Sequence, residues 1–291
     1  MVEAIGRARL SVDMAAYSLN LWSIRDALIG AHRRGVTVRI VMESDNMDVS
    51  EVQDLIGAGI PVVGDQHEGL MHDKFVILDR EEVWTGSMNY TVSGVYKDNN
   101  DLLWIRSGQL ARVYTDEFEK MFSQHHFGPE KYILPTRISL DLDELPVEVY
   151  FSPQDGAESR LLDLIRAARE SIRFLAFSFT SNDLGEAIIE KARSGVVVTG
   201  VMDSSQVKAD EGTEYDLFRQ AGLDVRLDGN QKGLMHHKLI LTDEAIVVTG
   251  SFNFTNSAET RNDENMLVLS SRELAARYLQ EFSKVFDQAK P

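Results

Sequence analysis

The sequence predicts an α/β protein made of two duplicated halves, each a mixed, largely parallel sheet flanked by helices, with pseudo-twofold symmetry. Three observations predict this fold class. Stretches of the first half recur in the same order in the second half, as expected for an internal duplication. Apolar runs of strand length alternate with amphipathic runs of helix length, and each half closes on a long helical pattern.

The repeat appears at two closely related spacings. Residues 11–19 resemble residues 171–179 at a shift of 171 − 11 = 160. Residues 69–79 resemble residues 233–243 at a shift of 236 − 72 = 164, and the later segments keep this second shift. We therefore expect the four extra residues of the second half to lie within the polar stretch 204–213.

The second half shows the elements of one repeat in order. Apolar and β-branched runs predict strands, and apolar residues spaced three and four apart predict helices. Gly195 ends one of the helices, and Asp243–Glu244 joins two of the strands. The expected order is a strand at 146–152, a helix at 157–169, a strand at 171–179, a helix at 184–195, a strand at 196–202, a helix at 215–221, strands at 223–227, 237–243 and 244–250, and a helix at 272–288.

The first half repeats this scheme without a counterpart of the strand at 146–152. Its sequence starts at the helix that corresponds to residues 161 onward, as expected if an N-terminal segment has been removed or if the chain starts at an internal methionine. The predicted organisation is a first half at 1–127, a connector at 128–145 and a second half at 146–291. The connector contains two prolines and an acidic run, which is typical of a bridge between folded units.

Composition limits the classes of function. A net charge of −16 and a hydrophobic fraction of 43% predict a soluble acidic protein, whose overall field repels nucleic acid and anionic membranes. The absence of cysteine excludes disulfides, thiolate catalysis and cysteine-ligated metals. No apolar run is long enough to predict a membrane span. The compartment stays open between the cytoplasm and export by a signal outside these residues.

Each half carries the same polar residues at the same spacing. A histidine is followed by a lysine two residues later and by an aspartate five residues after that, and Gly-Ser-x-Asn begins seven residues further on. Because residues two apart in a strand face the same side, each histidine should project together with its lysine. The two sets are His72, Lys74, Asp79, Gly86, Ser87 and Asn89, and His236, Lys238, Asp243, Gly250, Ser251 and Asn253.

This pattern indicates phosphoryl chemistry. Lysine ammonium and asparagine amide groups bind phosphate oxygens, and each Gly-Ser-x-Asn segment places short polar groups beside a turn that glycine permits. One neutral histidine can attack phosphorus while a second, protonated histidine donates its proton to the leaving oxygen. A duplicated fold supplies two equivalent histidine positions, and this scheme requires no metal and no cofactor.

The doubled HxK(x)4D–GSxN motif resembles that of the phospholipase D superfamily over nearly the whole chain, apart from the connector and the missing strand. The resemblance implies a covalent phosphohistidine intermediate, with His72 as the nucleophile and His236 as general acid and then base. It also implies phosphate binding by Lys74, Lys238, Asn89 and Asn253 with Ser87 and Ser251, turns shaped by Gly86 and Gly250, and structural or electrostatic support from Asp79 and Asp243.

Members of this superfamily also carry an acidic residue after GSxN that orients a histidine. Glu264 fits this role, and the equivalent position in the first half is Asn100, with Asp98 and Asp101 as the acidic alternatives. An amide can orient an imidazole, but it does not stabilise an imidazolium as a carboxylate does. We therefore expect the two catalytic histidines to have unequal electrostatic support.

The remaining histidines carry no such motif. His237 is expected on the opposite face of its strand from His236 and outside the chemistry. His32 and His67 have no partner motif and are expected to be surface residues.

Three functions fit these features. A compact, nuclease-like phosphodiesterase that cuts DNA or RNA is preferred, because almost no sequence lies beyond the repeated fold and because GLMHxK resembles the compact nucleases of the superfamily. A phospholipase D that hydrolyses or transphosphatidylates phospholipids is the alternative, which the negative charge favours. A non-catalytic binding protein is the remote third, because both motifs are intact.

Two structural features would help to separate these functions. A basic groove above the histidines would favour nucleic acid, and an apolar rim would favour lipid. A monomer is chemically sufficient because one chain supplies both motifs. The missing strand would leave a sheet edge open to another molecule, so an oligomer is also compatible with the sequence.

Overall fold

The computed structural model describes residues 1–131, 138–209 and 212–290, and its first half forms a six-stranded sheet in the order β3-β2-β1-β4-β5-β6. The strands are β1 (Ser11–Ala16), β2 (Thr37–Met42), β3 (Val62–Gly64), β4 (Lys74–Leu78), β5 (Glu82–Gly86) and β6 (Leu102–Arg106). The helices are α1 (Val2–Arg7), α2 (Trp22–Arg33), α3 (Ser50–Gly57), α4 (Val92–Tyr96) and α5 (Gly108–Phe122), with a 3-10 turn η1 (Ser44–Asn46).

The second half forms an eight-stranded sheet in the order β11-β10-β9-β12-β13-β14-β8-β7. Its strands are β7 (Ile138–Leu142), β8 (Leu145–Ser152), β9 (Ser171–Ala176), β10 (Val197–Met202), β11 (Asp224–Leu227), β12 (Lys238–Thr242), β13 (Ile246–Gly250) and β14 (Glu264–Ser270). Its helices are α6 (Ala157–Ala167), α7 (Asn182–Arg193), α8 (Ser204–Ala209), α9 (Tyr215–Gln220), α10 (Asn256–Thr260) and α11 (Arg272–Gln288), and the 3-10 turn η2 (Gly128–Lys131) precedes β7.

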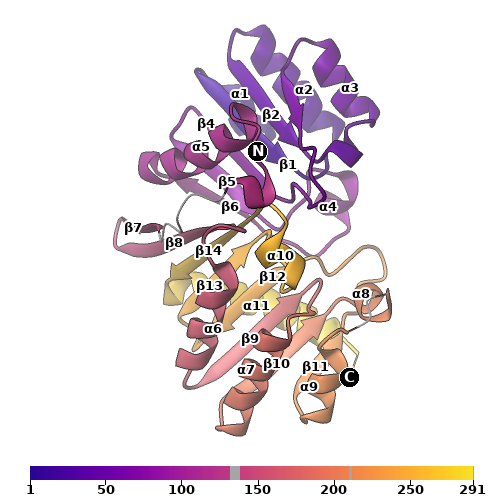
Figure 1. Ribbon diagram of the computed structural model, residues 1–291, viewed down its shortest axis with the longest axis vertical. Coiled ribbons are helices and arrows are strands. Elements are labelled where there is room, and N and C mark those ends of the chain that lie inside the picture. The colour runs from indigo at the N-terminus through magenta and orange to yellow at the C-terminus, as the bar shows by residue number, and fades with distance from the viewer. Residues whose placement is uncertain (132–137, 210–211, 291) are drawn as a thin grey trace.

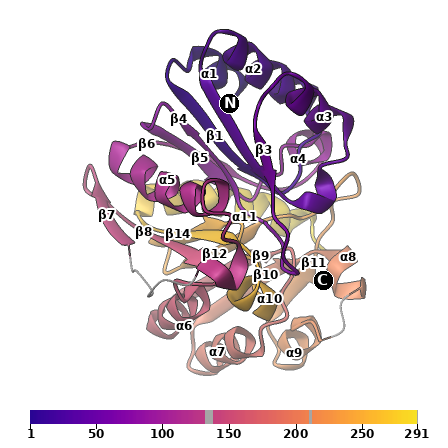
Figure 2. The ribbon, with the colours of Figure 1, turned by 45° about the horizontal axis from the view of Figure 1, so that its top comes forward.

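The two sheets stack with helices between and outside them (Figures 1 and 2). Helices α5 and α11 pack into one apolar core together with side chains from both sheets, including Val41 of the first sheet and Val201 of the second. Helices α1, α2 and α3 cover the outer face of the first sheet, and α6, α7 and α9 cover that of the second. The result is a layered α/β/α/β/α body in which the two repeats meet through α5 and α11.

Short hairpin turns fix the register of the strands that carry the motifs. Strands β4 and β5 are joined through Asp79 and Arg80, which both have positive φ, at 53° and 59°. Asp243 and Glu244 repeat this geometry between β12 and β13, with φ of 53° and 51°. Two successive left-handed residues give the turn whose twist matches that of paired strands. Each hairpin therefore holds its lysine-bearing strand in the centre of a sheet.

The prediction of two mixed sheets flanked by helices is confirmed, but the balance of strand directions differs from the expected one. Parallel pairing is confined to β1, β2 and β3 in the first sheet and to β9, β10 and β11 in the second. The other strands pair antiparallel, so the sheets are not largely parallel. Part of the reason is a pair of three-residue turns, at 79–81 and 243–245, which join β4 to β5 and β12 to β13 without a crossover helix.

The connector predicted at 128–145 is more than a bridge. Its last part forms β7, which pairs antiparallel with β8 at the edge of the second sheet, while residues 132–137 lie outside the described residues. In the second half, the polar stretch expected to hold the four extra residues begins with α8, and residues 210–211 of that stretch are likewise outside the described residues.

Candidate active site

The two histidine motifs meet because each is hydrogen bonded to the other half. The His72 amide donates to the carbonyl of Asp263 at 2.9 Å, and the Asp263 amide donates to the carbonyl of Leu70 at 2.8 Å. In the other direction, the His236 amide donates to the carbonyl of Asn99 at 2.7 Å. Each motif thus contacts the segment just before the last strand of the opposite repeat. This exchange brings both histidines to the junction of the halves.

His72 is buried against a carboxylate from the other half. Its Nδ1 lies 2.7 Å from Oε2 of Glu264, whose side chain is fully buried. Burial is the main cause that holds the pKa of His72 well below its usual value, and burial raises the pKa of Glu264 to about 7. An ionised Glu264 accepts a hydrogen bond from the protonated Nδ1 of His72. The lone pair of the neutral ring then lies on Nε2. The ring of Tyr17 lies edge-on to His72, with a centroid distance of 4.8 Å.

His236 has a different partner. Its Nδ1 lies 3.0 Å from the carbonyl oxygen of Ser87, and because a carbonyl only accepts, Nδ1 is the donor. Ser87 is itself held by Asp101, whose Oδ1 accepts from the Ser87 hydroxyl at 2.8 Å. Burial, followed by the nearby charges of Lys238 and Lys74, lowers the pKa of His236 well below its usual value. The two histidines therefore have the unequal surroundings that the sequence predicts.

The two motif lysines are buried near each other, and the closest acidic influence on both is the carboxyl of Glu264. Lys74 and Lys238 are 1% and 2% exposed, and each Nζ donates to the carbonyl of its own motif histidine. Within the described part of the chain neither forms an ion pair. Burial lowers the pKa of Lys74 to about 7 and that of Lys238 well below its usual value, and the charge of Lys74 adds to the effect on Lys238. An anion bound between them would offset this cost.

Asn89 and Asn253 complete a set of donors suited to a phosphate. Both side chains are half-buried, and the Oδ1 of each has no hydrogen-bond partner in the described residues. Their amide groups can donate to phosphate oxygens, as can the N–H groups of each lysine that its histidine carbonyl does not use. No three or more histidine, aspartate or glutamate side chains gather to hold a metal ion in the described ranges.

The motif aspartates lie at the far end of their strands. The Asp79 carboxylate accepts from the backbone amides of Arg9, Leu10 and Ser11 at 2.7–3.1 Å. Asp243 does the same for the backbone amides of residues 169–171. The resemblance implies that these aspartates give structural or electrostatic support. The contacts are of the structural kind, because each carboxylate caps the start of β1 or β9. Neither carboxylate contacts the histidine of its motif.

Two further expectations are wrong in detail. The hydroxyls of Ser87 and Ser251, expected to bind phosphate, are fully buried and accept from the backbone amides of Asp101 and Asn265. Asn100 does not orient a histidine, because its amide donates to the carbonyl of Gly94 at 2.7 Å and fixes α4 instead. Among the acidic alternatives, Asp101 is linked to His236 through Ser87, whereas Asp98 accepts from the amide of Leu234.

The glycines of the two GSxN segments are required by close packing. A Cβ on Gly86 would lie 2.4 Å from the carbonyl oxygen of Asp101, and one on Gly250 would lie 2.3 Å from that of Asn265. Both distances are far shorter than a side chain tolerates. These glycines let the strand before each asparagine approach the strand that follows α4 or α10.

His67 is a bridge between the halves rather than a surface residue. Its Nδ1 lies 2.9 Å from Oδ2 of Asp65, and its Nε2 lies 3.2 Å from the carbonyl of Arg261. No repeated motif marks this residue, so sequence patterns do not indicate its role. His237 does face away from His236, as expected, and lies between Asp101 and Glu281 at 3.6 and 3.5 Å.

The sequence analysis also missed two carboxylates that bind the backbone just before each motif histidine. Glu43 accepts from the amide of Met71 at 2.9 Å, and Asp203 accepts from the amide of Met235 at the same distance. Both residues could have been found from the sequence. They are 203 − 43 = 160 residues apart, which is the repeat shift, and each directly follows a buried strand.

Comparisons with known proteins identify the family of the chain. The sequence family described as "Cardiolipin synthase, PLD-like domain" matches residues 1–122 and 161–286. A mitochondrial cardiolipin hydrolase of Chlamydomonas reinhardtii is 37% identical over 132 residues, which cover 45% of this chain and 58% of that protein. A phospholipase D of Rickettsia bellii is 35% identical over 167 residues, covering 57% of this chain and 81% of that protein.

A solved structure shares the complete fold. The phosphatidylserine synthase of Haemophilus influenzae Rd KW20 superposes with a TM-score of 0.75 at 14% identity, covering 99% of this chain and 84% of that one. The match to the cardiolipin hydrolases spans little more than half of their length, 58% for the algal protein and 54% for the human one. Since the family match covers both repeats, the chain belongs to the phospholipase D superfamily.

Proposed function

We propose that the chain hydrolyses phosphodiesters through a phosphohistidine on His72, with His236 as general acid and then base. The observation that supports this is the unequal pair of Nδ1 partners: a carboxylate for His72 and a carbonyl for His236. Phosphorylation of Nε2 makes the imidazole cationic, and a carboxylate on Nδ1 stabilises that charge, whereas a carbonyl only fixes the ring. The same reasoning makes Lys74, Lys238, Asn89 and Asn253 the phosphate ligands.

The proposed reaction has two displacements. In the first, Nε2 of neutral His72 attacks phosphorus, the bond from phosphorus to the leaving oxygen breaks, and protonated His236 gives its Nε2 proton to that oxygen. In the second, His236 takes a proton from water, the water oxygen attacks phosphorus, and the phosphorus–nitrogen bond breaks. His236 ends protonated and His72 neutral, so the enzyme is regenerated. The bound anion offsets the two lysine charges that lower the pKa of His236, which favours its protonated form.

A trapping experiment with bis(p-nitrophenyl) phosphate tests these roles. We expect the His236→Ala variant to release one equivalent of p-nitrophenol and then to stall, because this leaving group needs no acid but the second step needs a base. The phosphoryl group should map to His72. The His72→Ala variant should give neither burst nor adduct, and His32→Ala serves as the control. An adduct on His236 in the wild-type protein would reverse the assignment.

For the substrate, we infer that phospholipid is better supported than nucleic acid, reversing the preference drawn from the sequence. Trp22 and Tyr96 are 61% and 73% exposed, and Val92 and Val95 lie beside Tyr96 on α4, directly after the first GSxN segment. The Val92 amide donates to Oδ1 of Asn20, two residues before Trp22, which ties the two segments together. We call Trp22, Val92, Val95 and Tyr96 the apolar rim.

The rim has no equivalent in the other repeat. The corresponding residues there are Asn182, Asn256, Glu259 and Thr260. Clustered exposed aromatic and aliphatic side chains are typical of a surface that meets lipid. The names of the relatives, cardiolipin hydrolase and phospholipase D, support the same substrate class.

Nucleic acid is the second candidate, favoured by the compactness of the chain. A panel of phosphatidylcholine vesicles, cardiolipin vesicles, single-stranded DNA, duplex DNA and RNA separates the two. We expect cleavage of a phospholipid in this panel, abolished in His72→Ala. Turnover of nucleic acid alone would overturn the phospholipid assignment and leave the two-histidine mechanism in place.

A further inference from the structure

The side chain of His67 joins the loop that precedes His72 to the segment that carries Glu264. Its Nδ1 lies 2.9 Å from Oδ2 of Asp65 on its own loop, and its Nε2 lies 3.2 Å from the carbonyl oxygen of Arg261 in the other repeat. A carboxylate and a carbonyl only accept hydrogen bonds, whereas a neutral imidazole carries a single N–H. The protonated ring alone can donate to both, so the bridge is complete when His67 is charged.

A buried carboxylate lies beside the same ring. Oδ2 of Asp263 is 3.6 Å from Nε2 of His67 and has no hydrogen-bond partner among the described residues. Its other oxygen accepts from the Gly128 amide and pairs with the Lys131 ammonium, each at 2.7 Å. Burial by itself would lower the pKa of His67, but the hydrogen bond to Asp65 and the charge of Asp263 outweigh burial and raise this pKa above its usual value of 6.5.

Further charged or titratable groups lie around the ring on the neighbouring elements. They comprise two ion pairs, a histidine and a glutamate that line a cavity of about 490 Å³ together with His67, and a glutamate whose charge acts on Asp65. In that order, the groups are Arg261 with Glu68, Lys131 with Glu117, His125, Glu130 and Glu43. The hydrogen bonds of the ring itself go to Asp65 and to the Arg261 carbonyl, so loss of its proton acts on these two contacts.

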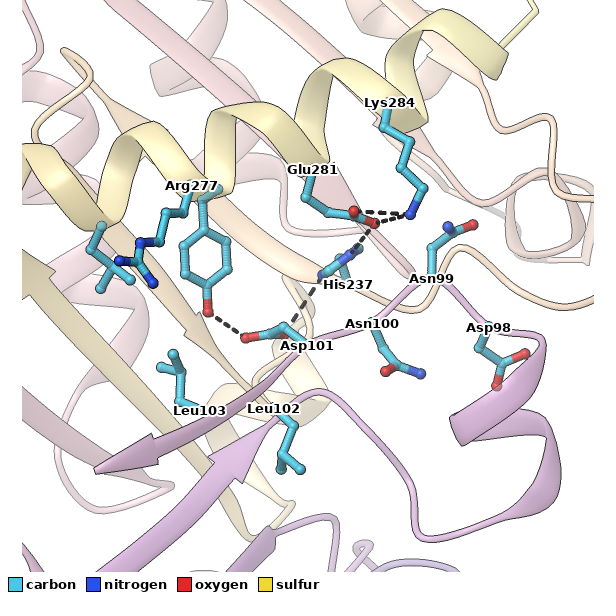
Figure 3. A pocket seen from close by; sticks show the side chains of 12 residues that line it. Asp98, Asn99, Asn100, Asp101, Leu102, Leu103, His237, Arg277, Glu281 and Lys284 are labelled. Atoms are coloured by element: carbon cyan, nitrogen blue, oxygen red, sulfur yellow. Dashed lines mark hydrogen bonds and ion pairs between the residues drawn. The ribbon is translucent and has the colours of Figure 1, made fainter. Parts of the chain in front are cut away.

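The second repeat builds the same bridge with an uncharged amide. Asn230 lies in the loop before the second motif histidine, and its Nδ2 donates to the carbonyl of Lys97 at 2.9 Å and to Oδ1 of Asn99 at 3.0 Å. Figure 3 shows Asn99 on the segment between α4 and β6. At the repeat shift of 164, the two acceptor residues correspond to Arg261 and Asp263. An amide keeps its donors at every pH, so only the bridge of the first motif can respond to pH.

The bridge stands at one end of two paired segments, and the His72–Glu264 pair stands at the other. Beyond the bridge, the Asp263 amide donates to the Leu70 carbonyl at 2.8 Å, and the His72 amide donates to the Asp263 carbonyl at 2.9 Å. Glu264 follows directly, and its Oε2 lies 2.7 Å from Nδ1 of His72. A change at His67 therefore reaches the pair through the backbone that both segments share.

We propose that His67 is a positioning residue for the His72–Glu264 pair, and that its protonated ring holds together the two segments that carry them. Loss of the ring proton removes one of the two donated hydrogen bonds and loosens the pair. Because the pKa of His67 is raised, the bridge is present below this pKa and is lost as pH rises through it. This role rests on the proposed function, in which Glu264 stabilises the charge that His72 gains.

Hydrogen exchange tests the bridge without any substrate. From about pH 6 to about pH 9, protection factors of the amides between the bridge and the pair should fall by about three- to tenfold in the wild-type protein, the effect of one lost hydrogen bond. The matching amides of the second repeat are the internal control and should keep their protection. The two sets are Leu70, His72 and Asp263, and Leu234, His236 and Asn99. Equal changes in both sets, or none in the first, would overturn the proposal.

Rates on bis(p-nitrophenyl) phosphate test whether the bridge acts on the reaction. His67→Gln replaces the titratable ring by an amide, so the ratio of its kcat to that of the wild type should rise about three- to tenfold from about pH 6 to about pH 9. The titration of Glu264 is common to both proteins and cancels in the ratio. At the lower pH, His67→Ala should have a lower kcat than both, with KM nearly unchanged. His125→Gln, at an exposed histidine of the same cavity, is the matched control and should follow the wild type.

The outcomes separate the positioning role from the proposed function. A constant ratio, or a His67→Gln variant as slow as His67→Ala at every pH, would overturn the positioning role and leave the two-histidine mechanism standing. Absence of turnover in every protein would overturn the proposed function and the positioning role with it, while the exchange result would still decide whether the bridge opens with pH.

Discussion

At the scale of single residues, the pKa of Glu264 links the mechanism to pH. Burial raises this pKa to about 7, and only the ionised carboxylate can stabilise the positive charge that the His72 ring gains when Nε2 is phosphorylated. We therefore expect kcat/KM to rise with pH through about 7. In Glu264→Gln this acid limb should disappear and kcat should fall by about 10²- to 10⁴-fold. Glu273→Gln, at an exposed position on α11, is the matched control. An unchanged limb in Glu264→Gln would assign the titration to another group.

The same pKa makes a prediction about stability. The folded pKa of about 7 lies above the usual value of 4.5, so folding favours the protonated carboxyl. Its contribution to the free energy of unfolding is fully present below pH 4.5 and is lost as pH rises through 7. Glu264→Gln should therefore gain stability relative to the wild type between pH 5 and pH 8 in chemical denaturation. A relative loss over this interval would contradict a raised pKa.

We expect Asp101 to act as a positioning residue for His236, through Ser87. Its carboxylate holds the Ser87 hydroxyl, and the Ser87 carbonyl accepts from Nδ1 of His236. Asp101→Asn should slow phosphodiesters with alkoxide leaving groups by about tenfold and leave p-nitrophenyl esters nearly unaffected, because only the former need a general acid. Asn100→Ala, which removes a neighbouring amide, is the control. Equal slowing of both substrates would indicate general loss of structure.

At the scale of secondary-structure elements, we expect the motif aspartates to support the strands beside the histidines rather than the chemistry. Each carboxylate accepts from three consecutive backbone amides at the start of β1 or β9. Asp79→Asn and Asp243→Asn should each lower the free energy of unfolding by about 1–2 kcal/mol, because an amide oxygen is a weaker acceptor than a carboxylate. Urea titrations would measure this loss. A large fall in kcat of the folded variants would show a catalytic role instead.

Most elements were predictable from the sequence because the duplication tests each pattern twice. The strands that begin at the motif lysines and the turns at Asp79 and Asp243 follow from matched segments, whereas His72 and His236 lie just before these strands and not in them. Strand β7 was missed because it is short, overlaps the acidic stretch 141–144 and has no copy in the first half. The serine hydroxyls were misplaced because a motif gives residue types and spacing, while their orientation is decided by the buried amides of the neighbouring strand.

At the scale of the whole molecule, the duplication is symmetric in fold and asymmetric in chemistry. The acid that faces the opposite histidine is present once, as Glu264, and its counterpart Asn100 fixes α4. The second repeat is covered by β8, and the first is open along β6. No helix in the described ranges is long and apolar enough to cross a membrane. The apolar rim belongs to the first repeat, and the matching positions of the second repeat are polar.

The apolar rim predicts a difference between aggregated and dispersed substrates. If Trp22 enters the interfacial layer of a vesicle, Trp22→Ser should lower the rate on phosphatidylcholine vesicles by about tenfold, since burial of an aromatic side chain contributes at least about 1.4 kcal/mol. The rate on a soluble short-chain phosphodiester should stay unchanged, because the histidines and lysines are intact. Trp104→Ser is a matched control, since Trp104 is 55% exposed but lies on β6, away from the rim. Equal rates of both variants on vesicles would remove the rim from lipid binding.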